Sequence, residues 1–179
     1  MDYQEILSFW FEEIDSSLWW KKDDDFDGLI RHRFLSVHQQ ATQCELFEWR
    51  TSSLGRLAEV IVLDQFSRNL FRDLPQAFTS DALALALAQE AISLGQDADL
   101  SPVERSFLYM PFMHSESLAI HDVAVSLFEK NGIQSTLEFE HKHRDIIVRF
   151  GRYPHRNAIL NRESSTEELE FLAQPGSSF

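Results

Sequence analysis

The sequence is poor in the residues that interrupt helices or form cross-links. It has one cysteine among its 179 residues, Cys44, which excludes an internal disulfide and a cysteine-based metal cluster. Its six glycines and five prolines are too few for a turn-rich all-β protein, and they favour long helices. No hydrophobic run approaches the roughly 20 residues of a membrane span, so we expect a soluble protein.

Basic residues are also scarce. The chain has 16 Lys and Arg against 29 Asp and Glu, a net charge of −13. Because nucleic acids need a broad basic footprint, this balance argues against them as partners. Residues 1–5 lack the basic start of a secretion signal, and we expect a cytoplasmic protein with no membrane partner. The length fits a single domain over residues 1–179, with an irregular tail at 173–179.

Apolar residues recur at helical spacing along most of the chain. The pattern predicts about seven main helices and a short last one, at residues 3–14, 26–41, 54–70, 81–94, 101–111, 115–130, 135–151 and 165–172. The third of these is apolar nearly all round and is expected at the centre of the protein. Short connections favour antiparallel neighbours. The expected fold class is therefore all-α, an antiparallel multi-helix array.

Local signals mark several helix boundaries. Capping boxes, in which a serine is followed three residues later by a glutamate, are predicted at Ser101, Ser135 and Ser165. Pro111 is expected to end or kink the helix that begins after Ser101. Gly95 is expected to stop the fourth helix in a left-handed conformation.

Residues 141–157 form a cationic island in this acidic chain. They contain five Lys or Arg and three His against one acid. Crowded arginines need counter-charges, so the island indicates a place that holds anionic groups, from a ligand or from the protein's own carboxylates. His143 lies on the apolar stripe of its helix with Phe139, which is typical of a hydrogen-bonded core histidine. Asp145 is expected to orient a neighbouring arginine or histidine.

Two further polar segments lie at the end of the third predicted helix and after Pro111. Asp64, Arg68 and Arg72 are four apart and share one face if the helix continues. His114 precedes the next helix, where free backbone amides can hold an anion. The alternative for the face of Asp64, Arg68 and Arg72 is an exposed ion pair, and the alternative for His114 is simple N-capping of the next helix. All three segments are expected to meet, because each carries groups that are costly to bury alone. The candidate ligand-binding residues are Asp64, Gln65, Arg68, Asn69, Arg72, His114, Glu116, Arg149, Arg152, His155, Arg156 and Asn157.

Two functions fit these residues. The first is a helical scaffold whose polar pocket binds a small anionic molecule or an acidic peptide. The second is a hydrolase or transferase acting on a phosphate- or carboxylate-bearing small molecule, with arginines holding the anion and a histidine moving protons. Its residues would be Arg68, Arg72 and Arg152, with His114 or His155. We expect no cofactor and no metal, because the sequence has neither a Gly-rich phosphate loop nor a His-Glu-x-x-His pair.

Three long segments resemble the signatures of the domain of unknown function 924 family. They are Leu63–Arg72, Tyr109–Glu116 and His143–Asn157, and the closing Pro175–Phe179 also matches. The likeness covers nearly the whole chain. It implies an α-α superhelix of the tetratricopeptide-like class and no known activity. It also implies that the three polar segments are the signature of the family, which supports a shared site without giving its chemistry.

Overall fold

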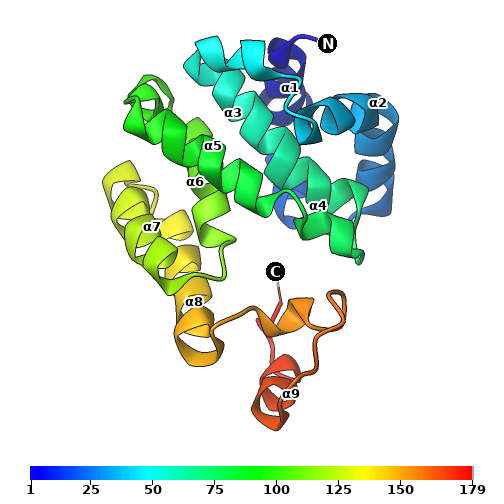
Figure 1. The fold of residues 1–179 in the computed structure, drawn as a ribbon, viewed down its shortest axis with the longest axis vertical. Helices are drawn as coiled ribbons and strands as arrows, with labels where there is room; N and C mark the ends of the chain where they lie inside the picture. Colours follow the sequence, from blue (N-terminus) through cyan, green and yellow to red (C-terminus); the bar gives the residue numbers. More distant parts are fainter. Residues whose placement is uncertain (179) are drawn as a thin grey trace.

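The computed structural model describes residues 1–178, and these residues form helices and connecting turns without any strand (Figure 1). This confirms the all-α prediction. The α-helices are α1 (Tyr3–Ser8), α2 (Asp24–Thr42), α3 (Ser53–Ile61), α4 (Ser67–Leu70), α5 (Asp81–Ser93), α6 (Pro102–Met113), α7 (Leu118–Asn131), α8 (Gln134–Phe150) and α9 (Thr166–Leu172). None of the helices in residues 1–178 has the length and apolar character needed to cross a membrane. The tetratricopeptide-like superhelix stays a prediction.

The third predicted helix follows one helical path but is not a uniform α-helix. The π turn η4 (Val62–Phe66) joins α3 to α4, and a second π turn, η1 (Phe9–Glu13), extends α1. A π turn adds a residue to the turn and often marks a functional position. Here it contains Asp64 and Gln65, so it sets the direction of two candidate site residues.

The centre of the protein is the apolar path through α3 and η4, as predicted. Helix α3 packs against α1, α5 and α6, while η4 packs against α2. The residues of this path with no exposed surface are Leu57, Ala58, Val60, Ile61, Val62, Leu63 and Phe66. Burial of this apolar surface is the main stabilising contribution.

Most helix ends follow their sequence signals. Ser101 and Ser165 form the predicted capping boxes, and Gly95 adopts the left-handed conformation. Helix α6 passes through Pro111 and ends at Met113, whose side chain is buried.

The predicted cap at Ser135 is wrong. Helix α8 begins at Gln134, with Ile133 as its N-cap and no side-chain capping bond. The left-handed Gly132 ends α7 and leaves only a two-residue link, so the chain enters α8 before Ser135.

A second, smaller apolar cluster lies at the C-terminal end of the fold. Ile146, Ile147 and Tyr153 are buried there, with Phe150 and Phe171 packed against them. In Figure 1 the chain after α8 turns beneath α4 to reach α9, which places this cluster apart from the main core. The described part of the tail, 173–178, forms turns and bends, and residue 179 lies outside the described residues.

Two expectations for α8 are wrong. Phe139 is 48% exposed, with the Lys142 ammonium 5.1 Å from its ring centroid. Asp145 is exposed and contacts no arginine or histidine within residues 1–178 through a hydrogen bond or ion pair. Both lie on the outer face of the helix, where solvent screens their interactions.

Candidate functional site

The three polar segments meet between the two apolar clusters. Asp64 Oδ1 in η4 lies 2.7 Å from His114 Nδ1, at the end of α6. The Arg156 guanidinium, in the 3-10 turn η7 (Pro154–Arg156), donates to the His114 carbonyl at 3.0 Å. Arg68 and Arg156 both contact Asp81, the first residue of α5. We call Asp64, Arg68, Asp81, His114 and Arg156 the central cluster.

Asp64 is the buried anchor of the cluster, with a side chain only 1% exposed. Its Oδ2 accepts a 2.6 Å hydrogen bond from Gln65 Nε2, and its Oδ1 faces both His114 and Arg68. Burial by itself raises the pKa of Asp64, but the Arg68 charge and the hydrogen bonds from His114 and Gln65 outweigh it and lower the pKa. Asp64 is therefore a carboxylate at neutral pH.

Two arginines share the carboxylate of Asp81. Arg68 donates to both of its oxygens, at 3.0 and 3.1 Å, and Arg156 Nη1 lies 3.3 Å from Oδ2. The Arg156 guanidinium also lies over the rings of Phe78 and Tyr153, 4.5 and 4.7 Å from their centroids. These contacts with the two rings fix the plane of the guanidinium.

The surroundings of Arg156 disfavour its charged form. Burial and then repulsion by Arg68 lower the pKa of Arg156, in spite of the attraction of Asp81. Its Nε atom is buried and has no hydrogen-bond partner within residues 1–178. A buried donor without an acceptor is costly, so this atom marks a place that an additional acceptor would stabilise.

One ring nitrogen of His114 is bound and the other is not. Its Nδ1 is bound to Asp64, whereas Nε2 has no hydrogen bond within residues 1–178 and is not a buried atom. Burial and then the charge of Arg68 lower the pKa of His114, so the ring is neutral at neutral pH. Because the ionised Asp64 only accepts hydrogen bonds, the ring proton resides on Nδ1 and Nε2 carries a lone pair.

A second ion pair adjoins the central cluster. Glu116 accepts from the Arg162 guanidinium at 2.7 and 2.9 Å and from the backbone N–H of Tyr153 at 2.8 Å. Asn157 is fully buried, donates to Ser164 and accepts from Arg162 Nε. This pair fixes the loop that carries Arg156.

His155 lies in the same loop, with its ring 5.6 Å from the Tyr153 ring. Burial and then the charge of Arg156 lower the pKa of His155 to about 4. His143 is buried, and its Nδ1 lies 2.7 Å from the Phe139 carbonyl. Burial lowers the pKa of His143 to about 3, which agrees with its interpretation as a core histidine.

Four of the predicted site residues lie elsewhere. Asn69 and Arg72 both bind Asp27 of α2, because α4 ends at Leu70 and the chain turns before Arg72 can share a face with Arg68.

The other two face α9. Arg149 pairs with Glu167, and Arg152 pairs with Glu168 at 2.7 Å. The left-handed Gly151 ends α8 between Arg149 and Arg152, so Arg149 stays on the last turn of the helix while Arg152 follows the change in chain direction.

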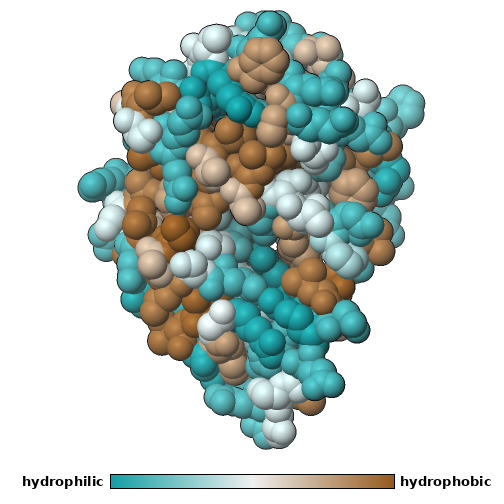
Figure 2. Space-filling model, in the orientation of Figure 1, coloured by the Kyte–Doolittle hydropathy of each residue, from teal (hydrophilic) through white to brown (hydrophobic). Residues whose placement is uncertain are grey.

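Among the described residues, the cationic island leaves no positive excess where the three segments meet. Arginines and carboxylates of the site are equal in number, and they are Arg68, Arg156 and Arg162 with Asp64, Asp81 and Glu116. Figure 2 shows a hollow between the α4 region and the C-terminal segment, with hydrophilic residues gathered beside it. Within residues 1–178 no group of three or more His, Cys, Asp or Glu side chains is arranged to hold a metal ion.

Sequence reasoning missed Asp81, Arg162 and Phe78. Asp81 follows Ser80 in the first turn of a helix, where an acid is expected for capping alone. Arg162 lies five residues beyond the cationic island, and a lone arginine in a loop gives no signal.

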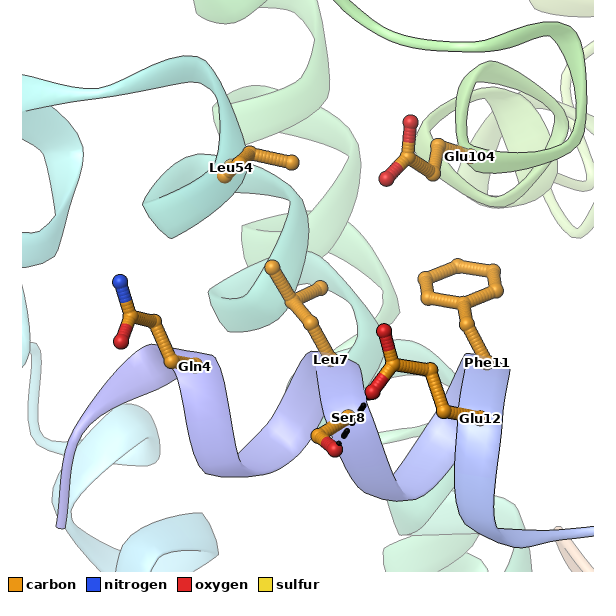
Figure 3. Close-up of a pocket in the computed structure, with 7 residues that line it drawn as sticks. All are labelled: Gln4, Leu7, Ser8, Phe11, Glu12, Leu54 and Glu104. Atoms are coloured by element: carbon orange, nitrogen blue, oxygen red, sulfur yellow. Dashed lines mark hydrogen bonds between the residues drawn. The ribbon is translucent and has the colours of Figure 1, made fainter.

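A separate groove of about 300 Å³ lies between α1, α3 and α6 and contains none of the predicted site residues. In Figure 3 Leu7 and Leu54 face each other across it, while the Glu104 carboxylate lies opposite Phe11. Glu12, also on its rim, accepts a hydrogen bond from Ser8 at 2.9 Å. The two sites are therefore distinct.

Comparisons with known proteins place the chain among uncharacterised relatives. A family described as a bacterial protein of unknown function, DUF924, matches residues 6–176. Among solved structures, the chain is similar to a protein of unknown function, ATU0120 from Agrobacterium tumefaciens, with 38% identity, a TM-score of 0.91 and 96% of each chain covered. No curated protein matches.

Proposed function

We propose that this chain, which belongs to the DUF924 family of bacterial proteins of unknown function, binds a small anionic molecule at the central cluster. The anion would be a carboxylate or a phosphate monoester group. It would accept hydrogen bonds from the two guanidinium groups beside His114.

The state of Arg156 is the observation that carries this proposal. Its side chain is 8% exposed, its Nε has no hydrogen-bond acceptor among residues 1–178, and burial and then the charge of Arg68 lower its pKa. A charge-assisted hydrogen bond to an anion would satisfy the donor and reduce the repulsion between the arginines.

Asp81 defines what kind of anion fits. Its carboxylate already bridges Arg68 and Arg156. A ligand must therefore bind the two arginines alongside this carboxylate or replace it. The three arginines and three carboxylates of the site balance without a ligand, and a small anion with one or two negative charges is therefore favoured over a polyanion. This balance also disfavours a long acidic peptide.

The test is a thermal-shift and calorimetric titration with acetate, succinate and inorganic phosphate, each at matched ionic strength against sodium chloride. At least one anion should raise the melting temperature saturably, because a ligand at its Kd stabilises by RT ln 2, about 0.4 kcal/mol, and more above it. Arg156→Gln should abolish the response.

Two variants control for general charge effects. Arg149→Gln removes an equal charge from an exposed pair with Glu167 and should leave the response unchanged. Arg156→Lys keeps the charge without the planar fork and should weaken binding. An identical response in wild type and Arg156→Gln, or no response to any of the anions, would contradict the proposal.

A further inference from the structure

We propose that the central cluster is catalytic, with His114 as the general base that activates water for the hydrolysis of a carboxylic ester bearing the bound anionic group. The inference rests on the proposed anion site and adds an activity to it. Asp64 acts as a positioning residue.

The arrangement of Asp64 and His114 carries the inference. The carboxylate is 1% exposed and lies 2.7 Å from Nδ1, while the histidine side chain is 15% exposed and its Nε2 is not among the buried atoms that lack a partner. A buried carboxylate that orients a histidine and fixes its tautomer leaves the opposite nitrogen free to accept a proton.

The carboxylate is itself held in place. Gln65 donates to Oδ2 at 2.6 Å, and Arg68 lies 3.2 Å from Oδ1. All of these residues except His114 come from η4 and α4, so the π turn positions the dyad. A side chain that only capped the next helix would need none of these contacts, and Ser117, not His114, is the N-cap of α7.

The ring is neutral where a base is needed. Burial lowers the pKa of His114, and the charge of Arg68 lowers it further, against the opposing effect of Asp64. The charged and titratable groups that face it are Asp64 and Arg68 of η4 and α4, Asp81 of α5, His143 of α8, and His155 and Arg156 of η7.

An ester is the substrate whose hydrolysis requires only a base, a water and hydrogen-bond donors for an oxyanion. His114 Nε2 takes one proton from water while the water oxygen bonds to the ester carbonyl carbon. The carbonyl oxygen becomes an oxyanion, to which the guanidinium groups of Arg68 or Arg156 can donate. When the intermediate collapses, the carbon–oxygen bond to the alcohol breaks, and the leaving oxygen takes the proton from Nε2. The products are the carboxylic acid and the alcohol, and no group is oxidised or reduced.

The first experiment acylates the histidines of the full-length protein with diethyl pyrocarbonate and locates the modified residues by mass spectrometry. His114 Nε2 should react, and the exposed His32 serves as the internal standard. Asp64→Asn should lower the rate at His114 by about tenfold relative to His32, because an amide can favour the wrong tautomer. No acylation of His114, or an unchanged rate in Asp64→Asn, would overturn the dyad.

Inorganic phosphate separates this inference from the proposed anion site. Protection of His114 by phosphate supports both. Acylation that phosphate does not slow supports the dyad and contradicts an anion site beside it. Saturable phosphate binding in calorimetry with an unreactive His114 supports the anion site and overturns the catalytic inference.

The second experiment measures hydrolysis of 4-nitrophenyl hydrogen succinate, an ester with one negative charge, against neutral 4-nitrophenyl acetate. The wild type should hydrolyse the anionic ester faster than His114→Gln by about a hundredfold, the size of a general-base contribution. Equal rates for wild type and His114→Gln would overturn the hydrolytic step. A preference for the neutral ester would overturn the assignment of an anionic substrate.

Discussion

At the scale of single residues, the ion pairs of this chain differ chiefly in burial. The Arg162–Glu116 pair has side chains 24% and 27% exposed, and Glu116 also accepts from a backbone N–H. In the Arg149–Glu167 pair the exposed fractions are 46% and 61%. The more buried Arg162–Glu116 pair should contribute more to the free energy of unfolding than the exposed pair, because water screens exposed pairs.

We therefore expect Arg162→Gln to lower the free energy of unfolding by about 1–3 kcal/mol, since it leaves a half-buried carboxylate without its partner. Arg149→Gln, the matched change in an exposed pair, should alter stability by about 0.5 kcal/mol or less. Urea denaturation of the two variants measures the difference. Equal losses would show that the Arg162 pair contributes no more than a surface contact.

At the scale of elements, the ends of α6 and α8 give a matched comparison of capping. Ser101 caps α6 and accepts from the Glu104 N–H, whereas Ser135 lies within the first turn of α8 and caps nothing. Ser101→Ala should lower the free energy of unfolding by about 1 kcal/mol. Ser135→Ala should leave it unchanged or slightly raise it, because alanine favours helix. A larger loss in Ser135→Ala would contradict the observed start of α8.

The same elements explain how much the sequence could predict. Capping at Ser101, the stop at Gly95 and the central apolar path follow from side-chain chemistry within a few residues, so local patterns suffice for them. The start of α8 depends on where Gly132 ends the preceding helix. A π turn at η4 has no local signature, yet it determines which residues reach His114.

The sequence could predict that three segments meet at the site, but it could not predict which residues of those segments form it. Burying Asp64 and Arg156 requires partners, and this requirement can be read from the sequence. Which arginine enters the cluster depends on where α8 ends, and Arg152 turns to α9 as a result. Asp81 supplies the counter-charge of Arg156 from α5, a helix whose sequence pattern indicates only packing.

At the scale of the whole molecule, buried neutral histidines should make the protein sensitive to acid. Burial lowers the pKa of His143 to about 3 and that of His155 to about 4, from the usual value near 6.5. The unfolded chain therefore binds protons before the folded protein as the pH falls through 6.5. Stability is fully present above pH 6.5 and is lost as the pH falls toward the folded values.

Between pH 7 and pH 5 we expect a loss of about 2 kcal/mol of unfolding free energy for each of these histidines. His143→Gln should reduce the pH-dependent loss by about 2 kcal/mol, while the same change at the exposed His32 should leave the loss intact. Urea denaturation at both pH values provides the measurement. A free energy that does not change between pH 7 and pH 5 would contradict the burial of neutral rings.

The most direct test of the central cluster as an anion site is ¹⁵N NMR of the His114 ring during a titration with inorganic phosphate at pH 7. A single site built from the three segments requires a neutral ring with its proton on Nδ1, bound to Asp64, and with an unprotonated Nε2 beside the arginines. The predicted result is this tautomer in the free protein and a saturable shift of the Nε2 resonance as phosphate binds. A proton on Nε2 would contradict the arrangement of Asp64 and His114. A His114 spectrum that phosphate leaves unchanged would contradict the existence of an anion site at the central cluster.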